Sequence, residues 1–112
     1  MRFRRALDRG NVTEALSAAS ELQFVALSDA LELTLLLADK EPEKYERAAA
    51  RWHVRFLQEV PNVAMRESQA VLGLLVAIPV NRLAAGALAE LLSRRRSCER
   101  IAESLVRWSR EA

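Results

Sequence analysis

The stretch EPEKYERAAARWHVRFLQEV, Glu41–Val60, is the longest uninterrupted helical pattern in the chain. Pro42 suits the first turn of a helix, because the N–H that proline lacks would have no partner there. The acidic residues around it place negative charge at the positive end of the helix dipole, and Pro61 marks the end of the pattern. This stretch therefore predicts one long helix.

Apolar side chains cover about two thirds of the circumference of this helix. At about 100° per residue, one stripe contains Tyr45, Ala48, Ala49, Trp52, Phe56 and Val60. The stripe is widened sideways by Ala50, Val54 and Leu57. A helix this apolar needs cover on more than one side. We therefore expect Trp52 and Phe56 to be core anchors.

Outward from this helix, periodicity and stop signals divide the rest of the chain. We expect helices at about residues 3–9, 11–22, 28–40, 62–78, 81–93 and 97–108. Gly10 is placed to end the first of them as a left-handed residue. The residues expected to cap the later helices are Asn11, Ser28, Asn62, Asn81 and Ser97. The helix at 28–40 is apolar on nearly all sides, which predicts a central position.

Two details within these helices bear on packing. The helix at 62–78 has one apolar side with Val71, Leu74, Leu75 and Ile78, and another with Met65, Leu72 and Val76. In the next helix, Gly86 and its alanine neighbours would permit a neighbouring helix to approach closely.

Composition and length predict the fold class. The chain has 112 residues with three glycines and three prolines, and helix-forming alanine and leucine dominate it. Connectors of two to five residues force neighbouring helices to be antiparallel. We therefore predict an all-α fold, a single all-helical domain over residues 1–112, built as a compact bundle or short superhelix of six to seven antiparallel helices.

Charge is distributed unevenly along the chain. Residues 1–9 carry four Arg and one Asp, residues 10–43 carry seven acids and one Lys, and residues 44–112 carry twelve basic residues and seven acids. The formal net charge is only +2. Such segments bear on the choice of partner more than on the fold.

The sequence predicts a cytoplasmic protein. The longest apolar run, residues 70–78, is about half the length that a membrane helix requires. The start of the chain lacks the apolar region of a secretory signal. The single cysteine, Cys98, has no partner for an internal disulfide, which fits a reducing compartment.

One segment resembles a known helical repeat. LDRGNVTEALSAASEL, Leu7–Leu22, is similar to the turn and second helix of a tetratricopeptide repeat, with Gly10 at the turn and Ala15, Leu16 and Ala19 at small or apolar positions. The aromatic and proline signature of that repeat is absent, so no peptide-binding residues are carried over. More broadly, the texture around YERAAARW, residues 45–52, is similar to small uncharacterised all-helical proteins of actinobacteria. The first resemblance implies a helical hairpin, and neither resemblance implies anything about activity.

Residues of catalytic type are few. His53, the only histidine, has no Ser, Cys or Asp within helical reach, as a general base would need. Cys98 follows three arginines, which can depress a thiol pKa, but its apolar helix stripe favours a small core residue. Glu41, Glu43 and Glu46 are explained by their place at a helix start. With no metal or phosphate motif, we expect no catalytic residues, no metal, no cofactor and no enzymatic activity.

Basic residues are the only candidates for a contact site. They form a line on the predicted helix at Glu41–Val60 and a cluster near the carboxyl end. These residues are Lys44, Arg47, Arg51, Arg55, Arg94, Arg95 and Arg96. Such residues can track phosphates, although an equally ordinary reading is a solvated helix face. The stretch Leu88–Trp108 resembles a helix-turn-helix reader only weakly, because Arg94 and Glu99 fall at positions that should be buried.

Two functional hypotheses remain open. The first is a small helical protein-interaction or scaffold protein that associates with a protein partner or with itself, most simply as a homodimer in which an acidic face meets the basic helix line. The alternative is a nucleic-acid-binding accessory or regulatory protein that uses the basic helix faces. The sequence leaves the partner, the process and the oligomeric state undetermined.

Overall fold

The computed structural model describes residues 2–111, which contain seven α-helices and two 3₁₀ turns. In chain order these elements are α1 (Arg2–Arg9), α2 (Val12–Glu21), α3 (Leu27–Lys40), η1 (Pro42–Lys44), α4 (Tyr45–Glu59), α5 (Met65–Ala77), α6 (Leu83–Leu92), η2 (Arg96–Cys98) and α7 (Glu99–Arg110). The predicted all-α class is confirmed.

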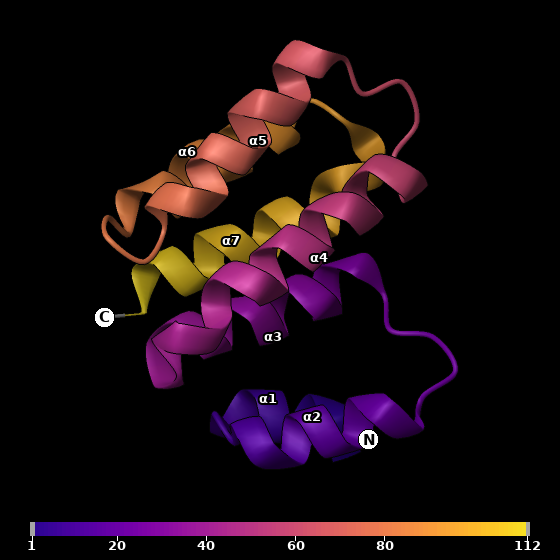
Figure 1. Ribbon diagram of the computed structural model, residues 1–112, viewed down its shortest axis with the longest axis vertical. Coiled ribbons are helices and arrows are strands. Elements are labelled where there is room, and N and C mark those ends of the chain that lie inside the picture. Colours follow the sequence, from indigo (N-terminus) through magenta and orange to yellow (C-terminus); the bar gives the residue numbers. More distant parts are fainter. Residues whose placement is uncertain (1, 112) are drawn as a thin grey trace.

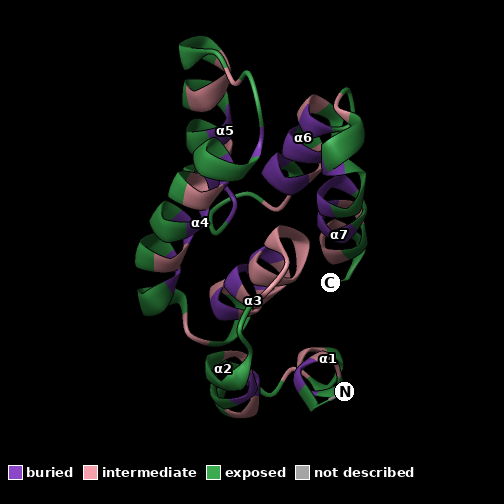
Figure 2. Ribbon diagram, turned by 90° about the vertical axis from the view of Figure 1, so that its right-hand side faces the viewer, coloured by how far each residue is buried: buried purple, intermediate pink, exposed green. Residues whose placement is uncertain are grey.

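Helix α3 lies at the centre of the fold, as its apolar circumference predicts (Figure 2). It packs against α4, α7 and the α1–α2 hairpin. Helices α5 and α6 form a second hairpin at the other end of the molecule from α1 and α2 (Figure 1). With principal extents of 36 × 30 × 22 Å, the helices form a closed bundle around α3 and not an open superhelix.

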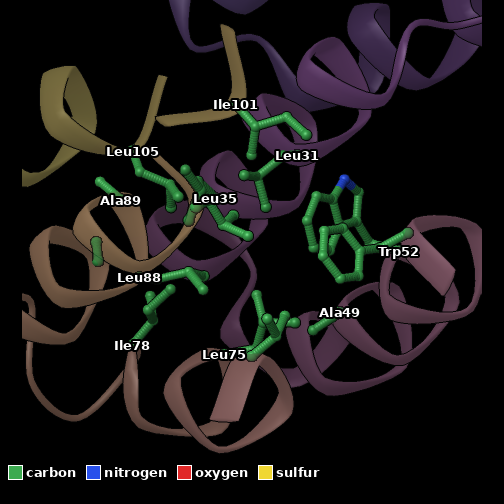
Figure 3. Packing of buried hydrophobic residues seen from close by; sticks show 14 of the residues in the cluster. Leu31, Leu35, Ala49, Trp52, Leu75, Ile78, Leu88, Ala89, Ile101 and Leu105 are labelled. Carbon is green, nitrogen blue, oxygen red and sulfur yellow. The ribbon is translucent and has the colours of Figure 1, made fainter. Parts of the chain in front are cut away.

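The main core lies between α3, α4, α5, α6 and α7 (Figure 3). Its largest fully buried side chains are Phe56, Leu31, Leu35, Leu75, Ile78, Leu88, Leu92, Leu105, Val71 and Cys98. These positions recur every three or four residues within each helix, which is the spacing that puts side chains on one helical face. The bundle is therefore held by one apolar face from each of five helices.

Helix α4 contributes the two predicted core anchors. Trp52 is 2% exposed and Phe56 is 0% exposed, and their rings stack with centroids 5.5 Å apart. The indole Nε1 of Trp52 donates a hydrogen bond to the carbonyl of Leu27, 2.9 Å away, which ties α4 to the start of α3. The hydroxyl of Tyr45 donates to the carbonyl of Leu75 at 2.7 Å.

Two expectations about this stretch are wrong. Its first residues form the turn η1 rather than α-helix, and its sideways apolar residues Ala50, Val54 and Leu57 are exposed. The neighbours α3 and α5 cover one side of α4 only, because the bundle has no further helix to place on the other. Part of the apolar surface of α4 therefore remains exposed to solvent.

The α1–α2 hairpin has its own small core. Gly10 has a φ of +69°, and the N–H of Asn11 donates to the carbonyl of Ala6, as expected of a glycine that ends a helix. The side chain of Asn11 accepts from the N–H of Glu14, the predicted cap. The separate cluster contains Phe3, Ala6, Ala15 and Ala18. Apolar residues at helical spacing, Val12, Ala15, Leu16, Ala19 and Leu22, predict one buried face for α2, but Leu16 and Leu22 are exposed.

Three of the five predicted helix caps fail. Helix α3 begins before Ser28, and no side chain caps it. Asn62 instead adopts a left-handed φ of +57° in the turn after α4, so α5 starts three residues later. Ser97 lies inside η2. The predicted cap at Asn81 is confirmed, like the one at Asn11, because the side chain of Asn81 accepts a hydrogen bond from the N–H of Leu83 at 3.0 Å.

The expected close helix approach at Gly86 is also wrong. A Cβ placed on Gly86 would meet no atom within 4 Å. No helix of the described chain therefore uses the space that this glycine leaves.

Candidate interaction surfaces

The predicted basic line on α4 is only partly free. Lys44 Nζ lies 2.7 Å from a carboxylate oxygen of Glu41. Arg55 pairs with Glu59, also at 2.7 Å, and donates to the carbonyl of Val25. Among residues 2–111, no ion pair of the chain involves Arg47 or Arg51. The line thus reduces to two unpaired arginines.

The cluster at Arg94, Arg95 and Arg96 is divided in the same way. Arg95 Nε donates to Glu67 at 2.9 Å, and its terminal nitrogens donate to the carbonyls of Pro61 and Asn62. The guanidinium lowers the pKa of the Glu67 carboxyl below its ordinary value, chiefly through this hydrogen bond. Arg95 therefore holds the α4–α5 connector, and only its two neighbours are exposed.

The remaining free arginines do not share one hollow. Arg47 and Arg51 line a groove with Leu16 of α2 and Leu37 of α3. Arg96 lines a different one, beside Val60 at the end of α4. A continuous phosphate track would need the two sets in one row, and the fold separates them.

The acidic block of residues 10–43 is largely neutralised within the chain. Six of its seven acids have a cation within 4.0 Å; the pairs are Arg2 with Glu14 and Glu21, Arg9 with Glu14, Arg4 with Asp29 and Glu32, Arg107 with Glu32, Arg82 with Asp39 and Lys44 with Glu41. For five of these acids the partner is an arginine of α1, Arg82 or Arg107. The block therefore offers little net negative charge to a partner.

Seven of the ten large apolar residues that are exposed among residues 2–111 lie on α4, on α5, and on the stretch from the following connector to the first residue of α6. They are Val54, Leu57, Met65, Leu72, Val76, Val80 and Leu83. Val76 is 65% exposed and Val80 is 90% exposed. The side of α5 with Met65, Leu72 and Val76 is the second apolar side seen in the sequence. Residues 2–111 leave this side exposed.

Three of these residues, Leu72, Val76 and Val80, line a groove between α4 and α5. A hollow of about 510 Å³ is lined by Ala50 from α4, by Leu72 and Val76 from α5, and by Val80. The floor is formed by buried Tyr45, Ala49 and Leu75. We name the exposed side chains Ala50, Val54, Leu57, Met65, Leu72, Val76 and Val80 the α4–α5 face. Along α5, from Met65 to Val76, this face extends about 16 Å at 1.5 Å per residue.

The fold also makes one pair that helical reach did not predict. His53 Nε2 lies 3.1 Å from the hydroxyl of Ser68 and 3.2 Å from its carbonyl. Ser68 lies on α5, so only tertiary packing brings it near. Within the described chain, no hydrogen bond orients the other ring nitrogen of His53, as a nucleophile–base pair would need. The pair links α4 to α5.

Cys98 occupies the core position expected of it, at 0% exposure. Burial raises the pKa of its thiol above the ordinary value, which keeps the sulfur protonated and unreactive. In residues 2–111, no three His, Cys, Asp or Glu side chains are grouped so as to hold a metal ion. None of the helices in this range has the length and apolarity needed to cross a membrane.

The weak helix-turn-helix resemblance corresponds to α6, η2 and α7. Arg94 and Glu99, the two mismatched positions, are both exposed. Helices α6 and α7 lie along each other as an antiparallel pair (Figure 1). The two positions that such a reader would bury therefore lie on the surface, so the resemblance does not extend to the packing of the motif.

In comparisons with known proteins, no family model, no curated protein and no solved structure matches this chain. The function therefore has to be argued from the surfaces themselves.

Proposed function

We propose that this protein is a small, cytoplasmic, non-enzymatic interaction module that associates with itself through the α4–α5 face. The observation that carries this proposal is the exposed apolar surface of two adjacent helices, with Val54, Leu72 and Val76 standing clear of the core. Contiguous apolar surface of this extent on a helical protein is typical of an interaction site.

The mode of association differs from the charge-oriented homodimer that the sequence suggested. That dimer needs an acidic face for the basic line, but the acids of residues 10–43 are paired inside the chain. The α4–α5 face has apolar side chains in the middle. A two-fold dimer can bury the same face of both copies against each other, with affinity from apolar area rather than from charge.

The test is the mass of the protein in solution. We expect light scattering to give a dimer at high protein concentration, with little change between low and high salt, since screening weakens only charged contacts. The double change Val54→Glu and Val76→Glu should give a monomer, because a two-fold interface would bury four unpaired carboxylates.

A matched control changes two apolar residues outside the face. Leu16 lies on α2 and Leu22 directly follows it, at 40% and 39% exposure. The variant with Leu16→Glu and Leu22→Glu should keep the mass of the unchanged protein. A monomer at both salt concentrations for the unchanged protein excludes self-association. A dimer that survives the glutamates places the interface elsewhere.

The nucleic-acid hypothesis is the second candidate, and the unpaired Arg47 and Arg51 favour it. Binding that rests on such residues must weaken steeply with salt, because it works by release of counterions. A titration with duplex and single strands at two salt concentrations tests this. Charge reversal of both arginines should abolish binding. If binding remained instead, Arg94 and Arg96 would be the residues that carry it.

A further inference from the structure

A second groove lies between α6 and α7. In Figure 2 these two helices lie on the opposite side of the molecule from α4 and α5. It has a volume of about 760 Å³. Its floor is formed by small or apolar residues, Gly86 and Ala89 from α6 and Ala102 and Val106 from α7. The floor is shallow and open to solvent along both helices, a shape that suits a helix laid lengthwise.

Gly86 shows that this space is unused by the chain. The residue lies in the middle of α6, where glycine weakens a helix relative to alanine. A Cβ there would meet nothing within 4 Å, so no intrachain contact requires glycine at this position. The absence of a side chain leaves room for something outside the chain.

The charges around the groove are arranged in two halves. Glu90, Glu99 and Glu103 line it toward the start of α7. Arg107, Arg110 and Glu111 line it toward the end, where the two arginines outnumber the one acid. Among residues 2–111, no ion pair of the chain involves Glu90, Glu99 or Glu103. Unlike the acids of residues 10–43, these carboxylates keep their full charge for a partner.

We propose that the α6–α7 groove binds an amphipathic helix of another protein, with its apolar stripe on the small-residue floor. Its basic residues lie against Glu90, Glu99 and Glu103, and its acidic residues lie near Arg107 and Arg110. A helix with acids in its first turn and lysines or arginines toward its end meets this pattern, and that arrangement also suits the helix dipole. The partner helix therefore has its carboxyl end near the start of α7.

The probe is a labelled synthetic peptide of about 18 residues, long enough to be helical. It carries leucines at helical spacing, glutamates in its first turn and lysines in its second half. Fluorescence anisotropy should show saturable binding to the full chain that weakens with salt. A peptide with the glutamates and lysines exchanged should bind at least about tenfold more weakly, as expected when like charges meet.

Gly86→Leu is the blocking variant. Leucine is a stronger helix former than glycine and its Cβ enters open space, so the fold is retained while the groove is filled. We expect a loss of at least about tenfold in peptide affinity. Gly73→Leu is the matched control, because Gly73 lies in α5, is exposed, and also has nothing within 4 Å of its Cβ. It should bind the peptide as the unchanged protein does.

The charges are tested with a pair of variants of equal net charge. Glu90→Gln with Glu103→Gln should weaken the lysine peptide and flatten its salt dependence, whereas Glu43→Gln with Glu46→Gln should not. Failure of the unchanged protein to bind the peptide overturns the proposal, and so does equal binding by Gly86→Leu. If Gly86→Leu instead lowers the solution mass of the protein, the groove is occupied by a second copy and the proposal of a separate partner fails.

This test is independent of the self-association test. The blocking substitution lies on α6, and the α4–α5 face belongs to α4, α5 and the connector after α5. Loss of dimerisation by Val54→Glu with Val76→Glu, together with unchanged peptide binding, would show two separate surfaces.

Discussion

Trp52 and Phe56 join α4 to the centre of the bundle. We predict that Trp52→Ala or Phe56→Ala lowers the free energy of unfolding by about 3 to 5 kcal/mol, because a buried aromatic side chain loses both its transfer energy and its packing. Chemical unfolding measures the change. Gln58→Ala, on the exposed side of the same helix, should change it by less than about 0.5 kcal/mol. A loss below about 1 kcal/mol at Trp52 would contradict its assignment as a core anchor.

Tyr45 makes stability sensitive to alkaline pH. Burial raises the pKa of its hydroxyl well above the ordinary value, whereas in the unfolded chain that pKa is about 10. Above about pH 10 the unfolded chain releases the proton and the folded chain keeps it, so the unfolded state binds fewer protons and stability falls as pH rises.

We therefore predict that Tyr45→Phe costs about 1 kcal/mol near neutral pH, from the lost hydrogen bond to Leu75. The gap between the variant and the unchanged protein should narrow as the pH is raised beyond about 10. Urea unfolding at neutral and alkaline pH measures it. A gap that stays constant would mean that the hydroxyl titrates alike in both states.

Between elements, the connector from α4 to α5 depends on Arg95. Asn62 holds a left-handed backbone there, and Arg95 donates to the carbonyls of Pro61 and Asn62 while pairing with Glu67. A lysine cannot reproduce this planar fork of donors. We predict that Arg95→Lys speeds amide hydrogen exchange in residues 61–67, whereas Arg94→Lys, one residue away and exposed, does not. Equal exchange in the two variants would remove the role assigned to Arg95.

At the scale of the whole molecule, the α1–α2 hairpin is the separable part. Its small core shares no buried residue with the main cluster, and it is tied to α3 partly through Arg4 and Glu32, 2.8 Å apart. Regions with few buried contacts open independently of the rest. The hairpin should therefore open more readily than α3 to α7.

We predict that Phe3→Ala speeds hydrogen exchange throughout α1 and α2 and leaves the protection of α4 to α7 nearly unchanged. Phe24→Ala is the comparison, because Phe24 is 69% exposed and its loss should leave the exchange of both helices as it was. Uniformly faster exchange over all helices in Phe3→Ala would show that the bundle unfolds as one unit.

The amino-acid sequence by itself determined the helices and the buried stripe of α4. Helical spacing, the left-handed position of Gly10 and the prolines act through local backbone geometry, so they are readable without neighbours. Trp52, Phe56 and Cys98 were assigned to the core correctly for the same reason, since each shares a face with other apolar residues. Helix caps were harder to predict from the sequence. Asparagine is favoured in turns as well as at helix starts, and Asn62 lies in a turn.

Only the tertiary structure decided which side chains are exposed and which charged groups are paired. Val54 was expected to be covered, and Leu72 lies on the second apolar side of α5. Both are exposed, because burial depends on whether another helix packs against that side. Arg95 and Arg94 are alike in sequence, but only Arg95 lies within reach of Glu67 and the α4–α5 connector. The acids of residues 10–43 form a charged block along the chain and are neutralised in space, since the strength of a charge pair depends on distance in three dimensions and not along the chain.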